Sequence, residues 1–574
     1  MNNYLIWVSL SLNAVLLWVA ITKVPYTSVP FLVHPSDQYI DGAGWFEKHP
    51  IDFVNASAVF NTVHGALKQK DNDVFPVGVS FIPAYIPPNT LMYHSTSSPH
   101  IPDGYEWIAM DYEFSYNFAR FDRGKKPVFR RPPKRPHHDS TNGVHQVSSK
   151  FSLPSGNAFL YTFRNTKPLD KLIYLDGASA AKTNTGEMDQ QSILMRQKNV
   201  DERVDEYKAA EVICEWGKEF GLQGIIRLEI GYEMVLCDFH DGIELAANVS
   251  LNNVTDLAHL PYEKPVPETP LETKREKLLD GWSSFNSWEH LKAGGGVDDG
   301  EHRIVLDFSN MVTPLNSTWI NPDPYKRRIH NLSEPAKEAI ISDVRKGLVE
   351  PVDPFRKTDW QLLTRRIEEK FAPLFMLLQT SFRVFEENSK EGDLSEVLES
   401  AVSDLTRITF NFVRRYSNNN IKDQKAKEEQ AFKDAIKDYA FHTFPIATKA
   451  DSLVFSSLYR VTTEVVGSLF DIYYTTREML HDIYVEPSTA RHEEFKKTLL
   501  QKQKDLSDLL GVLRWSIFTR CSNSCAWDEV CYSPTWGPGP MGWGANDKYF
   551  VHDGDRYRIP TELTCVSYKD VPQR

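Results

Sequence analysis

The sequence predicts an α+β protein: a mixed α/β N-terminal domain follows a transmembrane anchor, and a C-terminal helical bundle and a disulfide-rich irregular tail come after it. Short runs of β-branched and aromatic residues, bounded by Pro, Gly, Asn or Asp, fill residues 76–310 and are typical of strands. Apolar residues at i, i+3, i+4 and i+7 fill residues 334–516 and indicate amphipathic helices. Four of the six cysteines lie in residues 517–574, a segment rich in Gly, Pro and Trp.

The composition limits the classes of protein to which the chain can belong. It has 574 residues, of which 41% are hydrophobic and 25% charged, as in ordinary globular proteins. These values exclude disorder over most of the length, and a mean hydropathy of -0.41 excludes a polytopic transporter. The formal net charge of -12 argues against a nucleic-acid partner, because such binding depends on neutralising phosphates.

Residues 4–22 are the single strongly apolar stretch and predict one membrane-spanning helix after a short N-terminal tail, residues 1–3. These nineteen residues carry no charge, and at about 1.5 Å per residue their length is close to the hydrocarbon thickness of a bilayer. Trp7 and Trp18 lie near the two ends, where aromatic side chains prefer the membrane interface. A cleaved signal peptide is the alternative, but no basic residue precedes the run and no Ala-x-Ala-like site follows it. The membrane is therefore a predicted partner.

Residues 23–75 are expected to form a stalk that merges into the mixed α/β domain, residues 76–310. Helix-like stretches at 111–121 and 201–220 lie between the strand-like runs, and a basic, Pro-rich loop is expected at 124–139. A solvated insertion explains this loop more simply than a site for an anionic lipid or another polyanion. The expected strands cover residues 77–82, 90–95, 106–111, 157–164, 171–177, 224–239 and 302–309.

A linker at 311–333 precedes the bundle, residues 334–516, whose helical pattern has no repeat of fixed period. Residues 452–474 are the next candidate for a membrane span, but three charged side chains interrupt them. Each charge would cost about 2.5–3.5 kcal/mol at the centre of a membrane, so this stretch is expected to be a core helix. The bundle has no pair of His residues spaced as metal ligands on one helical face. We expect neither a metal nor a cofactor.

The cysteines favour disulfides over a zinc site. The tail has the spacing C-x3-C-x5-C with a distant fourth cysteine, whereas zinc sites are typical of C-x2-C-like pairs. A segment this short buries little core of its own and benefits from cross-links. The pairing within the tail stays open, and Cys214 and Cys237 form either a third bridge or two buried thiols. The tail cysteines are Cys521, Cys525, Cys531 and Cys565.

Five N-x-S/T sequons, together with the even number of cysteines, favour an oxidising secretory lumen for the bulk of the chain. Lys23, the only basic residue near the anchor, would by itself favour the opposite orientation. Because the cysteines and sequons are several independent signals and Lys23 is a single one, we expect the lumenal orientation. We expect a single-pass glycoprotein of the endoplasmic reticulum or a later compartment, with most of the chain lumenal or extracytosolic. The sequons lie at Asn55, Asn248, Asn253, Asn316 and Asn331.

The strand-like run that ends in Tyr93-His94-Ser95-Thr96 has a possible catalytic interpretation. It is similar to the Y-H-G-T motif of the ADP-ribosyltransferase superfamily of the His-Tyr-Glu type, which residues 77–239 weakly resemble. The resemblance implies NAD as cofactor: a His would bond a ribose hydroxyl and a Tyr would stack on nicotinamide. A Glu would stabilise the positive charge of the oxocarbenium-like transition state. By order along the chain, the residues for these roles are His94, Tyr112 or Tyr116, and Glu229 or Glu233.

Two D-x-D matches suggest a second enzymatic interpretation, a type II metal-dependent glycosyltransferase. Such an enzyme would have a single N-terminal anchor and would hold its metal between the two aspartates. About two matches are expected by chance in a chain this acidic, and neither follows a convincing apolar strand. The matches are Asp71-Asn72-Asp73 and Asp553-Gly554-Asp555.

At the scale of the whole chain, several motifs combine with the N-terminal anchor. They are Y-H-S-T at 93–96, E-W-I-A at 106–109, R-N-T-K-P-L at 164–169 and C-A-W-D-E-V-C-Y at 525–532. In this combination the chain resembles a family of uncharacterised fungal single-pass membrane proteins, which implies a topology but no activity. We therefore expect a lumenal structural or interaction protein that is not an enzyme. The alternatives are an ADP-ribosyltransferase-like enzyme, or a degenerate NAD-binding relic of one, and a glycosyltransferase.

Overall fold

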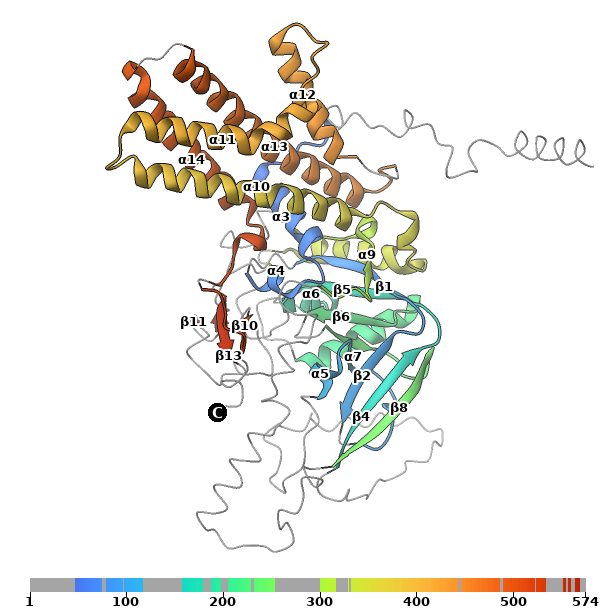
Figure 1. Ribbon diagram of the computed structural model, residues 1–574. Helices are drawn as coiled ribbons and strands as arrows, with labels where there is room; N and C mark the ends of the chain where they lie inside the picture. The colour runs from blue at the N-terminus through green and yellow to red at the C-terminus, as the bar shows by residue number, and fades with distance from the viewer. Residues whose placement is uncertain are drawn as a thin grey trace, which may run out of the picture.

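The computed structural model describes residues 47–74, 79–96, 98–116, 157–178, 187–197, 205–228, 232–252, 300–315, 319, 329, 332–441, 445–485, 489–521, 523–532, 551–553, 556–558 and 563–567. The expected anchor at 4–22 and the expected basic loop at 124–139 lie outside these ranges. Within them, no helix is both long and apolar enough to cross a bilayer. The described chain has an N-terminal sheet domain and a C-terminal helical region, and is of the mixed α+β class (Figure 1).

A nine-stranded sheet organises the N-terminal domain. Its strands are β1 (Phe81–Ile86), β2 (Leu91–Thr96), β3 (Glu106–Ala109), β4 (Asn157–Asn165), β5 (Leu169–Ala178), β6 (Gly224–Leu228), β7 (Glu233–Leu236), β8 (Ile243–Asn252) and β9 (Val305–Leu306). Their order is β8-β4-β2-β3-β7-β6-β5-β1-β9, and only β5 and β6 are parallel. The run expected as one strand at 224–239 forms the antiparallel pair β6 and β7. β8 was not among the expected strands, although apolar residues occupy every second position along it, and most of its side chains are exposed.

Three helices cover one face of the sheet. They are α6 (Glu187–Leu194), α7 (Glu206–Gly217) and α9 (Glu334–Val349). Their apolar side chains form a buried cluster with sheet residues such as Phe81 and Ile225. The sequence places α9 at the start of the bundle, but its Ile340 and Val344 belong to this cluster on the sheet. An amphipathic pattern indicates that a helix has a buried side and does not say which neighbour covers it.

The other face of the sheet shares its core with the helical bundle. One continuous cluster of buried side chains runs from the sheet through α3 (Phe53–Gly65) into the bundle. The sequence places residues 23–75 in a stalk, whereas α3 is a core helix whose Phe60 stacks on Trp515. The bundle helices are α10 (Trp360–Asn388), α11 (Leu394–Tyr416), α12 (Gln424–Tyr439), α13 (Lys449–Tyr484) and α14 (His492–Leu513). The stretch expected as a core helix at 452–474 lies within α13, one side of which is buried.

A buried carboxylate at the start of α13 joins the bundle to the sheet domain. Asp451 accepts hydrogen bonds from the Ser309 hydroxyl at 2.6 Å and from the indole N–H of Trp360 at 2.9 Å. Ser309 belongs to η6 (Phe308–Asn310), which follows β9, and Trp360 begins α10. The second carboxylate oxygen accepts from the backbone N–H of Thr448 at 3.2 Å, as part of a capping box. Directional bonds therefore fix the bundle on the sheet in addition to apolar contact.

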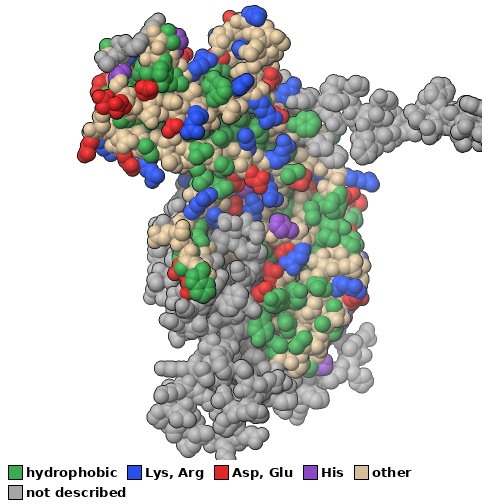
Figure 2. All heavy atoms as spheres, viewed as in Figure 1, with side chains coloured by type: hydrophobic (Ala, Val, Ile, Leu, Met, Phe, Trp, Pro, Cys, Tyr) green, Lys and Arg blue, Asp and Glu red, His purple; other side chains and the backbone are tan. Residues whose placement is uncertain are grey.

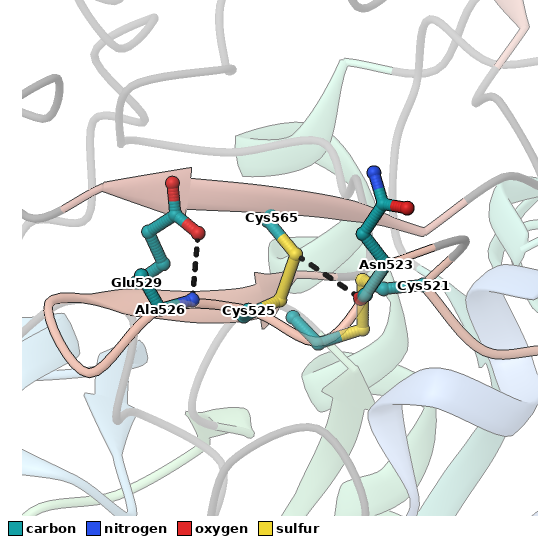
Figure 3. Close-up of a disulfide and its surroundings, with 7 residues drawn as sticks. Cys521, Asn523, Cys525, Ala526, Glu529 and Cys565 are labelled. Atoms are coloured by element: carbon teal, nitrogen blue, oxygen red, sulfur yellow. Dashed lines mark hydrogen bonds between the residues drawn. A yellow bond between two sulfur atoms is a disulfide. The ribbon is translucent and has the colours of Figure 1, made fainter.

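The C-terminal tail forms two small antiparallel strand pairs beside the sheet domain (Figure 1). Its strands are β10 (Glu529–Tyr532), β11 (Val551–Asp553), β12 (Arg556–Arg558) and β13 (Thr564–Ser567). All six cysteines form disulfides, namely Cys214–Cys237, Cys521–Cys531 and Cys525–Cys565. The first disulfide joins α7 to the chain that follows β7. The other two lie side by side and tie the chain before β10 to β10 and β13 (Figure 3).

Candidate binding site

His94, for which the ADP-ribosyltransferase resemblance implies a ribose contact, lies in the core of the sheet domain. Its side chain projects from β2 and the residue is 8% exposed. Nδ1–H donates to the backbone carbonyl of Trp107 at 2.6 Å, and the ring stacks on Tyr161 and meets Phe239 edge to face. Burial lowers the pKa of His94 to about 4, so the ring is neutral at pH 7. These contacts are those of a core histidine.

The strand register places Glu233 on the opposite face of the sheet from His94. Tyr93 pairs with Ala109, and Ala109 pairs with Glu233, so these three side chains share one face. His94 follows Tyr93 in the same strand and therefore points to the other face. Glu233 is buried in contact with the guanidinium of Arg227. His94 and Glu233 therefore cannot meet in one cleft.

The two tyrosines of the same implied site lie in α5 (Tyr112–Tyr116). Tyr112 is 45% exposed and meets the ring of Tyr93 edge to face, on the side away from His94. Glu229 lies outside the described residues. The geometry therefore does not favour an ADP-ribosyltransferase or an NAD-binding relic.

In a glycosyltransferase, the D-x-D motif would lie in a pocket at the end of a strand. The described residues of the two matches do not share this position. Asp71 lies in α4 (Gln69–Val74), a helix, and not at the end of a strand. Asp553 is the last residue of β11, whereas Asp555 and the side chain of Asp73 lie outside the described part of the chain. Of these residues, Asp71 nevertheless lines a pocket.

This pocket, of about 730 Å³, is lined mainly by three segments of the chain, to which Gly300, His302 and Leu563 are added. The end of α3 and α4 contribute one part, the N-terminal part of α10 a second, and residues 516–531 a third. Charged side chains of both signs gather between the bundle and the sheet in Figure 2. The charged residues of the lining are Lys68, Lys70, Asp71, Arg365, Glu368, Glu369 and Arg520.

The turn between α3 and α4 brings His64 close to Asp71. α3 ends at Gly65, Leu67 has a left-handed φ of 63°, and α4 begins two residues later. Asn72 Nδ2 donates to the Gly65 carbonyl at 2.9 Å and closes the turn. A Cβ on Gly65 would lie 2.7 Å from Cβ of Asp71, so a glycine is required for this close approach.

His64, which is 4% exposed, lies at the centre of the charged cluster. Its Nε2 contacts the Glu368 carboxyl, lies 3.0 Å from Lys68 Nζ, and lies 3.8 Å from Asp71 Oδ1. Nδ1 is buried, and the described residues offer it no hydrogen-bond partner. Burial, with the positive charges of Lys68 and Arg365, lowers the pKa of His64 well below its usual value. The ring is therefore neutral at pH 7.

Both buried carboxyl groups of the cluster have raised pKa values. Burial, reinforced by the charge of Asp71, raises the pKa of Glu368 to about 8, although Lys68 and Lys70 oppose this. Burial also raises the pKa of Asp71. At neutral pH, Glu368 therefore carries a proton that it can donate to Nε2 of the neutral His64.

Among the described residues that line the pocket, basic side chains outnumber acidic ones. Its lining contains four Lys or Arg side chains and three acidic ones. Arg365 and Glu369 form an ion pair at 2.8 Å and cancel, and Glu368 is protonated. Asp71 is the remaining acidic side chain of the described lining, and burial raises its pKa. The basic side chains other than Arg365 are Lys68, Lys70 and Arg520.

The cluster does not fit a metal ion. The ammonium group of Lys68 lies beside Nε2 of His64, the ring nitrogen that faces the carboxyl groups of Glu368 and Asp71, and it would repel a metal ion there. Sulfur atoms of the tail cysteines approach within 4.8 Å of one another, as metal ligands would. Each of them is bonded to another sulfur and offers no thiolate. In this disulfide state the tail has no thiolate ligands for zinc.

Neither His64 nor Glu368 was expected from the sequence to have a functional role. They lie in helices about 300 positions apart, and no short motif contains both. One signal for Glu368 does exist, because it falls in line with Thr364 and Phe371 on the buried side of α10. A charged residue at a core position of an amphipathic helix indicates a special environment.

Two family models match the chain, and the boundary between them falls at the boundary between the sheet domain and the helical bundle. Residues 46–155, 133–270 and 263–353 match a family model described as the YPL277C N-terminal domain. Residues 359–487 match one described as the YPL277C C-terminal domain. The gap between the two models falls between α9, which packs on the sheet, and α10, the first helix of the bundle.

Two relatives from Saccharomyces cerevisiae match much of the chain. Uncharacterized protein YOR389W is 34% identical over 573 residues, which covers 91% of this chain and 89% of the relative. Uncharacterized protein YPL277C is 36% identical over 406 residues, which covers 63% of this chain and 81% of the relative. No solved structure matches the chain.

Proposed function

We propose that this chain, which belongs to the family of YOR389W and YPL277C, is a membrane-tethered binding protein of an oxidising compartment. The observation that carries the proposal is the pairing of all six cysteines in three disulfides. Disulfides persist in the secretory pathway and outside the cell, and are rare in the reducing cytosol. Two of them hold together the tail that forms one wall of the pocket.

The tether is the apolar stretch at 4–22, which precedes the described part of the chain. It is long enough to cross a bilayer once. The described residues begin at 47, so a connection of about 24 residues would separate the membrane from the fold. This arrangement leaves the sheet, the bundle and the tail together on one side of the membrane.

The sequon at Asn248 supports the lumenal side. Asn248 is exposed on β8, one of the two edge strands of the sheet, as are the two residues that follow it. Asn55 is less accessible, because its side chain donates to Asp52 at 2.6 Å in the first turn of α3. We therefore expect a glycan at Asn248 in the folded protein.

The pocket supports binding in preference to catalysis. Its charged groups come from segments held by disulfides, by the closed turn at Gly65 and by the core contacts of α3, so they are positioned before a ligand arrives. His64 is neutral and in contact with Glu368 and Lys68, which already use its Nε2. A ring nitrogen engaged in this way holds the cluster together and is not available as a general base.

Peptide mapping of the full-length protein under non-reducing conditions, with endoglycosidase treatment, tests this proposal. We expect the three disulfides in the pairing given above and a mobility shift that Asn248→Gln reduces by one glycan. Asn418→Gln, which changes an exposed asparagine outside any sequon, is the matched control and should keep the shift. Six free thiols in a protein without glycan would refute the assignment to an oxidising compartment.

A further inference from the structure

The charges around His64 determine which molecules the pocket can accept. Lys68 and Lys70 line it on the α4 side and Arg520 on the side of the tail, whereas Arg365 of α10 is paired with Glu369. Charged donors that converge from several sides suit a compact ligand with several acceptor oxygens, because each donor can form its own bond. We propose that the pocket binds the oxyanion group of a polar small molecule, either a phosphate or sulfate or a pair of carboxylates.

The neutral part of the lining is consistent with such a ligand. Asn523 and Ser524 offer an amide and a hydroxyl group, which can donate to oxygen atoms that the cations do not reach. Ser516 hydrogen-bonds the Asp71 carboxyl group instead. Small-molecule pockets typically measure about 300–1,000 Å³. At about 730 Å³, this one is much larger than a free sulfate ion, so the oxyanion is one group of a larger polar molecule.

Ligand binding in this pocket is coupled to protonation of Glu368. This carboxyl group contacts His64 from α3, and the charges that act on it are those of Lys68, Lys70 and Asp71 around α4 and of Glu369 on its own helix. Loss of its proton adds a negative charge to the site and repels the ligand. A bound dianion in turn favours the protonated carboxyl group, so affinity falls as the pH rises through the pKa of Glu368.

This inference rests on the proposed function, because it names the ligand class of the same pocket. The ligand class and the compartment assignment can be refuted independently of each other. A protein that has three disulfides and a glycan but binds no oxyanion would refute the ligand class and leave the compartment assignment intact. A protein that has free thiols but binds an oxyanion would refute the compartment assignment and leave the ligand class intact.

The test is isothermal titration calorimetry of the full-length protein with inorganic sulfate at low ionic strength, at pH 6.5 and pH 9.0. Sulfate is a dianion at both values, so a change in affinity reports on the protein. We expect binding that is about tenfold tighter at pH 6.5. Phosphate and citrate, titrated in the same way, distinguish the two ligand chemistries, and tighter binding of either one supports the proposal. No binding of all three anions to the folded protein would overturn it.

Single substitutions test the named residues. We expect Lys68→Gln, Lys70→Gln and Arg520→Gln each to weaken sulfate binding about tenfold, which is typical for one charged hydrogen bond. Arg520 is exposed, so its replacement tests the site even where a buried lysine variant fails to fold. Lys346→Gln removes an exposed lysine on α9 and is the matched control. An equal loss of affinity in the control would show a diffuse charge effect and refute the site.

Glu368→Gln tests the coupling to pH. The amide keeps a neutral, hydrogen-bonding side chain at every pH and should retain the affinity that the unaltered protein has at pH 6.5. The difference between pH 6.5 and pH 9.0 should then disappear. A variant that binds sulfate with unchanged pH dependence would show that another group controls the site.

Discussion

His94 and His64 are both buried and both neutral at pH 7, yet their surroundings differ. His94 lies among aromatic rings and donates to a backbone carbonyl, so its nearest neighbours carry no charge. His64 lies beside Lys68, Asp71 and Glu368, at the wall of a pocket. The first region behaves as a core, and the second combines burial with several ionisable groups.

The comparison shows that burial alone does not reveal whether a histidine has a structural role or a binding role. Desolvation lowers the pKa of both rings, so the direction of the shift does not distinguish a structural role from a binding role. The residues that surround each ring distinguish a structural role from a binding role. A ring surrounded by charged groups in a concave site responds to ligands and to pH, whereas a ring among other rings contributes to packing.

The largest expected effect distinguishes the disulfide of the sheet domain from a disulfide that lines the pocket. Loss of one disulfide with a loop of 23 or 40 residues should cost about 3–4 kcal/mol in the segment that it closes. We expect this loss, by hydrogen exchange, in Cys214→Ser/Cys237→Ser and in Cys525→Ser/Cys565→Ser. Only the second double variant should weaken sulfate binding, because Cys525 lines the pocket. Equal sulfate affinity in both would show that the tail does not shape the site.

Replacement of His94 by alanine should act on stability alone. The change leaves a cavity between Tyr161 and Phe239 and removes the donor to the Trp107 carbonyl. We expect the free energy of unfolding to fall by about 2–4 kcal/mol, measured by urea denaturation. Sulfate affinity should stay within twofold of its original value. A loss of binding in a stable variant would place His94 in the functional site.

The pH dependence of stability should distinguish Glu368 from its neighbour Glu369. The pKa of Glu368 is about 8 in the folded chain and about 4.3 in an unfolded one. The folded state therefore keeps a proton that the unfolded state loses, and this stabilisation is complete below about pH 4.3 and lost as the pH rises through 8. Relative to Glu368→Gln, the unaltered protein should lose up to about 1.4 kcal/mol per pH unit across this window.

Chemical denaturation of both proteins at pH 5, 6, 7 and 8 measures this slope. Glu369→Gln is the matched control, since Glu369 is exposed on the same helix and paired with Arg365. Its difference from the unaltered protein should show no comparable slope. Parallel pH profiles for Glu368→Gln and the unaltered protein would contradict a protonated Glu368.

The smallest expected effect concerns Tyr112. Phenylalanine keeps the edge-to-face contact with Tyr93 and removes a hydroxyl from a side chain that is 45% exposed. We expect Tyr112→Phe to change the free energy of unfolding by less than about 0.5 kcal/mol, measured by the same denaturation. A loss above 1 kcal/mol would show that the hydroxyl makes a contact that matters for this region.

Much of the local structure could be predicted from the sequence. The strands expected at 90–95 and 157–164 match β2 and β4 closely, because both have the β-branched and aromatic composition of strands and clear turn residues at their ends. α3 and α9 show what could not be predicted. α3 is buried around most of its surface in the bundle core, and α9 has an apolar side that lies on the sheet, but neither pattern identifies its partner.

The sequence by itself determined the chemistry available at each position: an apolar stretch at 4–22, six cysteines, and a glutamate on the buried side of a helix. Only the tertiary structure decided which of these groups meet. His64, Glu368 and Cys525 line one pocket although hundreds of residues separate them. Periodicity along a chain records which side of an element is buried, whereas the partner on that side depends on how distant elements pack. The site around His64 is a product of that packing.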